Sequence, residues 1–177
     1  MKNIFYFLMV FMLTSCASQP SSSIPQTFNS QLNEGMVIGS IAFKNERPIF
    51  NGYMFYYIGE NIKKITSSKM ISISPEQIVK MKFQPNFFDN DKAVYFFSIT
   101  EIPGNYSFVT LRLFENGGFV QSSANIPIDI KFNIEKGKVK YLGEIYFDYN
   151  KGLIETSDKR DRDLPRLKEL YPSLKIE

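Results

Sequence analysis

Apolar and polar residues alternate with a period of two over several stretches of the chain, which predicts β-strands. The most regular stretch runs from Ile126 to Ile134, where Ile or Phe fills every second position and Pro, Asp, Lys and Asn lie between. A second alternating stretch, 139–147, follows the turn sequence 135–138, so we expect residues 126–148 to form an antiparallel hairpin. Gly143 falls in register with the apolar positions, which indicates a bulge or a close backbone contact.

Further strands are expected at residues 35–43, 53–58, 63–73, 93–100 and 106–114, separated by turn signals rich in Gly, Pro and Asn. In the first of these, apolar residues point both ways, so we expect it to be covered on both sides. Residues 74–83 predict a short helical turn followed by a strand. This pattern predicts an all-β fold, a single antiparallel β-sandwich of about seven strands over residues 34–150.

The tail, residues 151–177, changes character. A mixed charge run, 158–163, is followed by apolar residues three and four positions apart, and Pro172 then ends the segment. This spacing predicts a short C-terminal helix with one apolar face. Because so short a helix is marginal alone, we expect it to pack on the sandwich, with docking to a partner as the alternative.

Two segments resemble a known family of sandwich domains. The sequence Ile102-Pro103-Gly104-Asn105-Tyr106 is similar to the strand entry of prealbumin-like domains, which include the carboxypeptidase regulatory-like modules. Residues 132–143 are similar to the closing hairpin of small bacterial lipoproteins of that shape. The resemblance covers residues 94–148, implies a non-enzymatic binding or accessory module, and transfers no catalytic residue.

The N-terminus carries a short apolar run, 4–13, behind the single positive charge of Lys2. It is too short to span a bilayer, which takes about 20 apolar residues, and it is typical of a secretory signal. The run ends in Leu13-Thr14-Ser15-Cys16, which holds the only cysteine of the chain. An ordinary secretory signal is the alternative, but it would leave an unpaired thiol in an oxidising compartment.

Leu13-Thr14-Ser15-Cys16 resembles the lipobox of bacterial lipoproteins. The resemblance implies that residues 1–15 are removed as a signal peptide, that Cys16 is the lipid-attachment residue and that the mature protein is membrane-bound through its N-terminal lipid. Ala17 after the cysteine implies the outer membrane, with the periplasmic face favoured over the cell surface. Residues 16–33 are polar and contain Pro, so we expect a flexible tether.

Composition excludes several kinds of chemistry. The chain has 177 residues and no histidine, so a Ser-His-Asp or Cys-His arrangement and any imidazole zinc site are absent. The net charge of +3, with no basic block, does not indicate nucleic-acid binding. No Gly-rich phosphate loop is present. We therefore expect no catalytic residue, no metal and no cofactor.

Three features of the sequence are candidate binding sites. Asp89-Asn90-Asp91 could offer oxygen ligands to calcium, but it lacks the spacing of a calcium loop, so a solvated turn is expected. The neighbouring Phe87-Phe88 is expected to fold over the end of the sandwich, with an exposed contact point as the alternative. Tyr53, Phe55 and Tyr57 share one strand face, which is expected in the core and could otherwise bind a sugar or small molecule.

The sequence thus predicts an envelope lipoprotein that acts as a non-catalytic accessory, structural or protein-binding module. We expect it to bind the membrane through its lipid and an envelope protein as partner. Two alternatives stay open. One is a lipoprotein that binds a small molecule or sugar on an aromatic face, and the other is a hydrolase with two carboxyl groups about 5–9.5 Å apart in a cleft.

Overall fold

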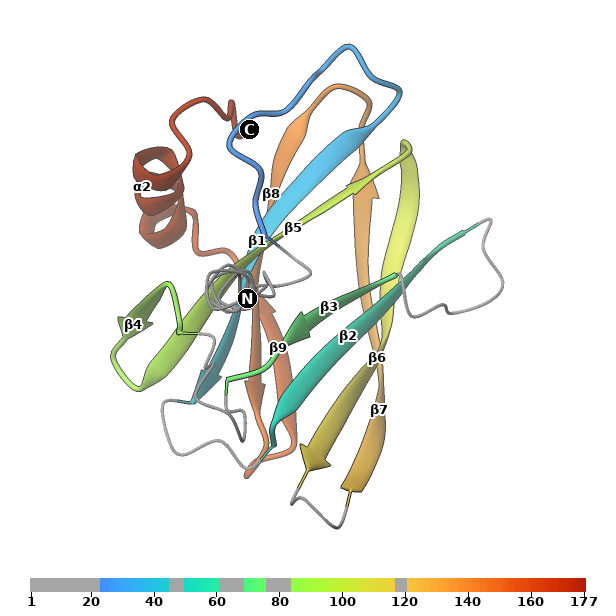
Figure 1. The fold of residues 1–177 in the computed structure, drawn as a ribbon, viewed down its shortest axis with the longest axis vertical. Helices are drawn as coiled ribbons and strands as arrows, with labels where there is room; N and C mark the ends of the chain where they lie inside the picture. Colours follow the sequence, from blue (N-terminus) through green and yellow to red (C-terminus); the bar gives the residue numbers. More distant parts are fainter. Residues whose placement is uncertain (1–22, 45–49, 61–68, 76–83, 117–120) are drawn as a thin grey trace, which may run out of the picture.

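The computed structural model describes residues 23–44, 50–60, 69–75, 84–116 and 121–177, which form two packed β-sheets and one helix (Figure 1). Sheet A has the order β4-β5-β1-β8-β9, and sheet B has the order β3-β2-β6-β7. The strands of sheet A are β4 (Phe87–Asp89), β5 (Lys92–Glu101), β1 (Gly35–Lys44), β8 (Val139–Asp148) and β9 (Leu153–Ser157). Those of sheet B are β3 (Met70–Ile73), β2 (Gly52–Gly59), β6 (Gly104–Asn116) and β7 (Gln121–Ile134).

The predicted all-β class is confirmed. The described residues form nine strands where about seven were expected, and all pairings are antiparallel except that of β1 with β8. The predicted strand within residues 74–83 lies almost entirely outside the described residues.

The predicted hairpin over residues 126–148 is wrong. Strand β7 pairs with β6 in sheet B, whereas β8 pairs with β1 and β9 in sheet A. Residues 135–138 carry the chain from one sheet to the other, with Gly137 at φ 71° donating its N–H to the Glu34 carbonyl at 2.8 Å. Phe132 and Ile134 of β7 and Ile145 and Phe147 of β8 pack in the same core from opposite sheets, so the alternating pattern does not require these strands to pair. Val139 and Tyr141 of β8 pack instead in a second cluster on the outer face of sheet A.

Gly143 takes the role expected for it. The pairing of β1 with β8 shifts by one residue between Ile38 and Gly39, so that Leu142 is the extra residue of a bulge. Gly143 has φ 109°, and a Cβ there would lie 2.8 Å from the Ser157 carbonyl oxygen of β9. Glycine therefore permits both the bulge and the close approach of β9.

The core between the sheets is rich in aromatic rings. Phe55, Phe97 and Phe108 are fully buried, and the ring of Phe108 lies 6.2 Å from that of Phe97 across the two sheets. Strand β1 is covered on both sides, as predicted, because Val37 and Ile41 face this core while Met36 and Ile38 face a second cluster.

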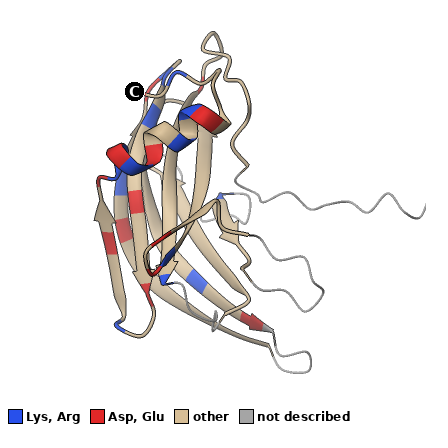
Figure 2. Ribbon diagram, turned by 90° about the vertical axis from the view of Figure 1, so that its left-hand side faces the viewer, with Lys and Arg blue, Asp and Glu red and all other residues tan. Residues whose placement is uncertain are grey.

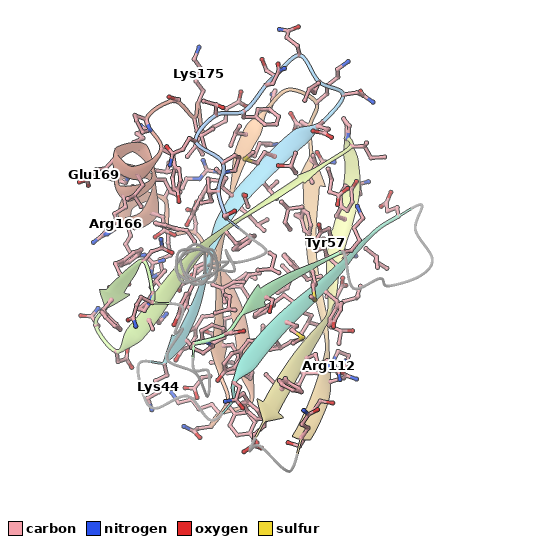
Figure 3. The ribbon with its side chains drawn as sticks, in the orientation of Figure 1. Lys44, Tyr57, Arg112, Arg166, Glu169 and Lys175 are labelled. Atoms are coloured by element: carbon pink, nitrogen blue, oxygen red, sulfur yellow. The ribbon has the colours of Figure 1, made fainter. Side chains whose placement is uncertain are left out.

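That second cluster lies on the outer face of sheet A, beneath helix α2 (Arg160–Leu170). Leu167 is fully buried against it and Leu164 partly, whereas Leu170 is 47% exposed. The helix therefore packs on the sandwich, as expected, with a narrower apolar face than the spacing suggested. Figure 3 shows Arg166 and Glu169 on the side of α2 away from the sheet.

The same cluster corrects the flexible tether predicted for residues 16–33. Ile24 is 7% exposed and packs in the cluster with Leu167, and Phe28 lies partly buried beside it. These two apolar side chains, in a stretch that is mostly polar, dock it on the domain. The described part of the tether is therefore part of the folded domain.

Candidate functional site

The proposed lipid-attachment residue, Cys16, lies outside the described residues together with the rest of the predicted signal peptide. The described part of the chain contains no helix that could span a bilayer, since α2 has 11 residues.

The aromatic stripe of β2 is core and not a binding surface. Tyr53, Phe55 and Tyr57 are 6%, 0% and 6% exposed and lie between the two sheets. The Tyr57 hydroxyl donates to Glu101 Oε1 at 3.1 Å, and Lys69 forms an ion pair with the same carboxylate. Burial, followed by the charge of Glu101, raises the pKa of Tyr57 above its ordinary value. A sugar or small molecule cannot reach this face in the folded domain.

Asp89-Asn90-Asp91 forms the tight turn between β4 and β5, where Asn90 has φ 51°. Asp89 accepts a hydrogen bond from Arg162 Nη1 at 2.8 Å, which lowers the pKa of this carboxyl. No group of three or more potential metal ligands is found within the described ranges. Asp89 therefore belongs to an ion pair with the C-terminal helix.

The adjacent Phe87 and Phe88 have different environments. Phe87 packs on Phe96 at 5.5 Å between ring centroids, and the guanidinium groups of Arg162 and Arg166 lie over its ring. Phe88 is 58% exposed. Phe87 thus packs in the apolar cluster under helix α2, while Phe88 remains at the surface.

A cluster of buried charged groups under α2 was not predicted from the sequence. Its centre is Arg162, whose side chain is 13% exposed, and its carboxylates include Glu144 and Asp163, both with fully buried side chains. Figure 2 shows acidic and basic residues along α2 and on the strands beside it. We call this group of Ser40, Asp89, Tyr141, Glu144, Arg162 and Asp163 the arginine cluster.

Arg162 holds three elements together. Its Nη1 donates to Glu144 Oε2 of β8 at 2.6 Å and to Asp89 Oδ2 of β4 at 2.8 Å. Its Nε donates to Asp163 Oδ1 at 2.7 Å. Burial alone would lower the pKa of this guanidinium, but the hydrogen bonds to the three carboxylates outweigh it and the pKa is raised. Arg162 therefore stays charged, as its carboxylate partners require.

The second oxygen of Asp163 is also satisfied. It accepts from Ser40 Oγ at 2.7 Å and from the Tyr141 hydroxyl at 2.6 Å. Burial, followed by the hydrogen bond to Asp163, raises the pKa of Tyr141. Lys92 Nζ lies 3.1 Å from Glu144 Oε1, so this carboxylate has two cationic partners. Every carboxylate of the cluster is thus matched by donors.

The chemistry available to this cluster is limited. Ser40 donates its proton to a carboxylate, but it is 0% exposed and no substrate can reach its Oγ. Glu144 and Asp163 are equally closed to solvent and are held by Arg162. The carboxyl pair expected for a hydrolase is therefore not offered by this group, which acts as a structural clasp.

A groove lies at the opposite sheet, where the ends of β2, β6 and β7 meet. Its volume is about 720 Å³, and Ile58, Tyr106 and Phe132 contribute apolar lining. Asn133 Nδ2 donates to Asn105 Oδ1 at 2.7 Å, and Asn105 Nδ2 donates to Glu60 Oε2 at 3.0 Å along its wall. The groove could not be predicted from the sequence, because its residues come from three separate strands.

Comparison with known proteins adds little to this description. No protein-family model matches the sequence, and no curated protein matches it. Among solved structures, the chain is similar to a leucine-rich repeat protein from Bacteroides thetaiotaomicron VPI-5482, with a TM-score of 0.40 and 12% sequence identity. The match covers 77% of this chain and 16% of that chain, so this chain spans less than a fifth of that protein. A likeness at this level establishes neither a shared fold nor a shared role.

Proposed function

We propose that this protein is a lipid-anchored lipoprotein of the bacterial cell envelope, with its β-sandwich acting as a non-catalytic accessory or protein-binding module at the outer membrane. The observation that carries the proposal is the short apolar run ending in Leu13-Thr14-Ser15-Cys16 ahead of a folded domain. The proposed partners are the membrane, through the lipid on Cys16, and an envelope protein. More than one acyl chain would make the attachment stable, at about 0.8 kcal/mol per buried methylene.

The fold supports a short connection between lipid and domain. Because Ile24 packs in the cluster under α2, only residues 17–23 separate Cys16 from the folded domain. A chain extends at most about 3.3–3.6 Å per residue, so this spacer reaches roughly 25 Å. The sandwich would lie close to the bilayer, with its attachment point on the outer face of sheet A.

The chemistry of the described residues favours a non-catalytic role. The chain has no histidine, and the buried carboxylates of the arginine cluster, Glu144 and Asp163, are matched by Arg162 and Lys92. Such pairing holds a helix in place and leaves these carboxylates of the arginine cluster unavailable as a general base.

Metabolic labelling with a clickable palmitate analogue tests the anchor. We expect the wild-type protein to be labelled and to fractionate with membranes, and Cys16→Ser to lose the label and leave the membrane fraction. Thr14→Ala is the matched control, because it keeps a small residue beside an intact cysteine and should stay labelled. Labelling of Cys16→Ser, or its unchanged fractionation, would overturn the proposal.

The accessory role has its own test. Cross-linking in intact cells, followed by purification of the membrane-bound protein, should recover a reproducible envelope protein. Recovery of no protein partner or cell-wall component by the wild-type chain would count against a binding module.

The groove favours a second candidate, a lipoprotein that binds a small polar molecule such as a sugar. Its volume of about 720 Å³ is in the range of ligand sites, and Asn105 and Asn133 place amide groups beside apolar lining. A thermal-shift screen with sugars would show stabilisation of the wild type that Asn133→Ala removes. No stabilising compound in such a screen would rule this candidate out.

A further inference from the structure

The four edge strands of the two sheets differ greatly in length. Strands β3, β4 and β9 have 4, 3 and 5 residues, whereas β7 has 14. Within the described residues, β7 pairs with β6 alone, so its other edge is open. A long open edge is the usual place for one chain to pair with another.

The side chains of β7 are more exposed than expected for a strand with neighbours on both edges. Residues Gln121–Asn125 are all exposed, and from Ile126 to Ile134 exposed residues alternate with partly or fully buried ones. The alternation is unbroken even though the pairing with β6 shifts between Phe108 and Thr110. Ile126, Ile128 and Ile130 face the core but are only partly covered. The edge of β7 thus carries one bulge, where Ile128 and Asp129 lie opposite Val109 of β6, and apolar side chains that remain partly exposed.

We propose that two copies of this chain pair through β7, antiparallel, about a two-fold axis at Ile130. In this register Ile130 faces its own copy, and Asp129 of each chain lies opposite Lys131 of the other. Opposed residues of an antiparallel pair share a face, so the inner residues Ile128 and Phe132 also meet. The pairing joins two four-stranded sheets into one sheet of eight strands.

The sequence of β7 selects this register over its neighbours. An axis at Asp129 or at Lys131 would place two like charges directly opposite each other. An axis at Phe132 would oppose Asp129 to Glu135, and an axis at Ile128 would leave both charges opposite uncharged residues. Among these five registers, only the axis at Ile130 places Asp129 and Lys131 each opposite a residue of the opposite charge.

In the monomer, the side chains of Asp129 and Lys131 are exposed and can contact a second copy. Asp129 and Lys131 are 68% and 81% exposed, and their side chains lie 3.8 Å apart in a weak surface ion pair. Ser107 Oγ donates to Asp129 Oδ1 at 2.7 Å, which holds this carboxylate on the outer face of the sheet. In the dimer, the two ion pairs within the chains are replaced by two ion pairs between the chains.

The symmetry also suits attachment to one bilayer. A two-fold axis that keeps the faces of an antiparallel sheet must run perpendicular to it. Both copies of sheet A then lie on the same side of the joined sheet, and so do both Ile24 residues, which pack on the outer face of sheet A. Figure 1 places α2 and β7 on opposite sides of the molecule, so pairing leaves the helix uncovered. The fit to one bilayer rests on the proposed function, whereas the register of β7 does not.

Cysteine cross-linking in membranes tests the register. Opposed Cα atoms of an antiparallel pair lie about 4.5–5.5 Å apart, within reach of a disulfide, so Ile130→Cys should form a cross-linked dimer under oxidation. Ile128→Cys is the matched control on the same face, because its copy would lie roughly 13 Å away along the strand. No dimer for Ile130→Cys, or equal yields for the two variants, would overturn the proposal.

The wild type serves as the second control. Its only cysteine is Cys16, so a disulfide dimer of the wild type would show an unlipidated thiol and would contradict the anchor instead. The register test would then be repeated in a Cys16→Ser background and would remain decisive for the pairing.

Charge exchange gives an independent measurement. The full mature chain, extracted in mild detergent, should be a dimer by light scattering. Asp129→Lys or Lys131→Asp should raise the dimer dissociation constant about 10-fold or more, because each creates two like-charge oppositions. The double exchange, Asp129→Lys with Lys131→Asp, should return it to within about 3-fold of wild type. A monomeric wild type, or a double exchange as weak as the single variants, would refute the pairing.

Discussion

Replacing Arg162 by alanine should destabilise the domain far more than a surface arginine would. The substitution removes the shared partner of Asp89, Glu144 and Asp163, and two of these carboxylates have fully buried side chains. Removing one partner of a buried ion pair costs about 3–5 kcal/mol, because the other charge is left in a low dielectric.

The structure places the cost at the lower end of that range. Glu144 keeps Lys92 at 3.1 Å, and Asp163 keeps the hydroxyl donors of Ser40 and Tyr141. We therefore expect a loss of about 3 kcal/mol in the free energy of unfolding, a large share of the 5–15 kcal/mol typical of a domain. With a urea slope of about 2 kcal/mol per molar, the unfolding midpoint should fall by about 1.5 M.

The assay is urea unfolding monitored by circular dichroism. Arg166→Ala is the matched control: its guanidinium also lies over the Phe87 ring, at 4.4 Å, but the residue is exposed. It should cost under about 1 kcal/mol. Asp163→Asn should lower the free energy of unfolding less in the Arg162→Ala background than in the wild type. The difference should be about 1 kcal/mol or more, because Asp163 has already lost its cationic partner in that background. Equal midpoints for Arg162→Ala and Arg166→Ala would refute the reasoning.

Three further predictions concern packing, backbone and titration. Leu167→Ala should cost about 2–5 kcal/mol in thermal or urea unfolding, because Leu167 is 0% exposed, and Leu170→Ala under about 0.5 kcal/mol, because Leu170 is 47% exposed; equal costs would mean that α2 is not docked as described. Gly143→Ala should cost about 3 kcal/mol from its φ of 109° and a Cβ contact of 2.8 Å, and Gly152→Ala about 1 kcal/mol from its φ of 61° alone; the reverse order would argue against the bulge. Burial raises the pKa of Tyr95 from 10.0 to about 12, so the stability that its neutral form contributes is complete below pH 10 and is lost as the pH rises through about 12. Tyrosinate absorbance and circular dichroism should therefore change together in that window, and full ionisation near pH 10 in a chain that stays folded would contradict the burial.

The sequence was sufficient for features that depend on a single strand or helix. The coverage of β1 on both sides, the bulge at Gly143 and the docking of α2 were all predicted and are confirmed. In each case one short stretch carries the whole pattern of apolar residues or glycine.

Pairing between strands could not be predicted in the same way. Alternation in β7 and β8 states which side chains are buried but not which strand lies beside them. The parallel pairing of β1 with β8 joins residues about 100 positions apart, and nothing local in either strand encodes it. The predicted hairpin failed for this reason.

The sequence carried a signal for the strand residues of the arginine cluster but not for its helix residues. The charge run 158–163 carries no local signal of burial, yet Asp163 is buried and the Arg162 side chain is only 13% exposed. A usable signal was present in the strands: Ser40 and Glu144 each interrupt an otherwise apolar or aromatic stretch, and a polar residue in a buried strand requires a partner. The identity of that partner still depended on the tertiary fold.

We infer that the cluster serves mainly to fix the position of α2. The helix has 11 residues, and only Leu167 among its apolar side chains is fully buried. The apolar contacts of Leu167 and Leu164 stabilise without direction, so they would permit rotation or sliding of the helix on the sheet. Arg162, in contrast, bonds to Asp89 of β4 and to Glu144 of β8, and these directional contacts allow one placement. Since Ile24 packs in the cluster that Leu167 covers, the placement of α2 also determines where the N-terminal chain leaves the domain.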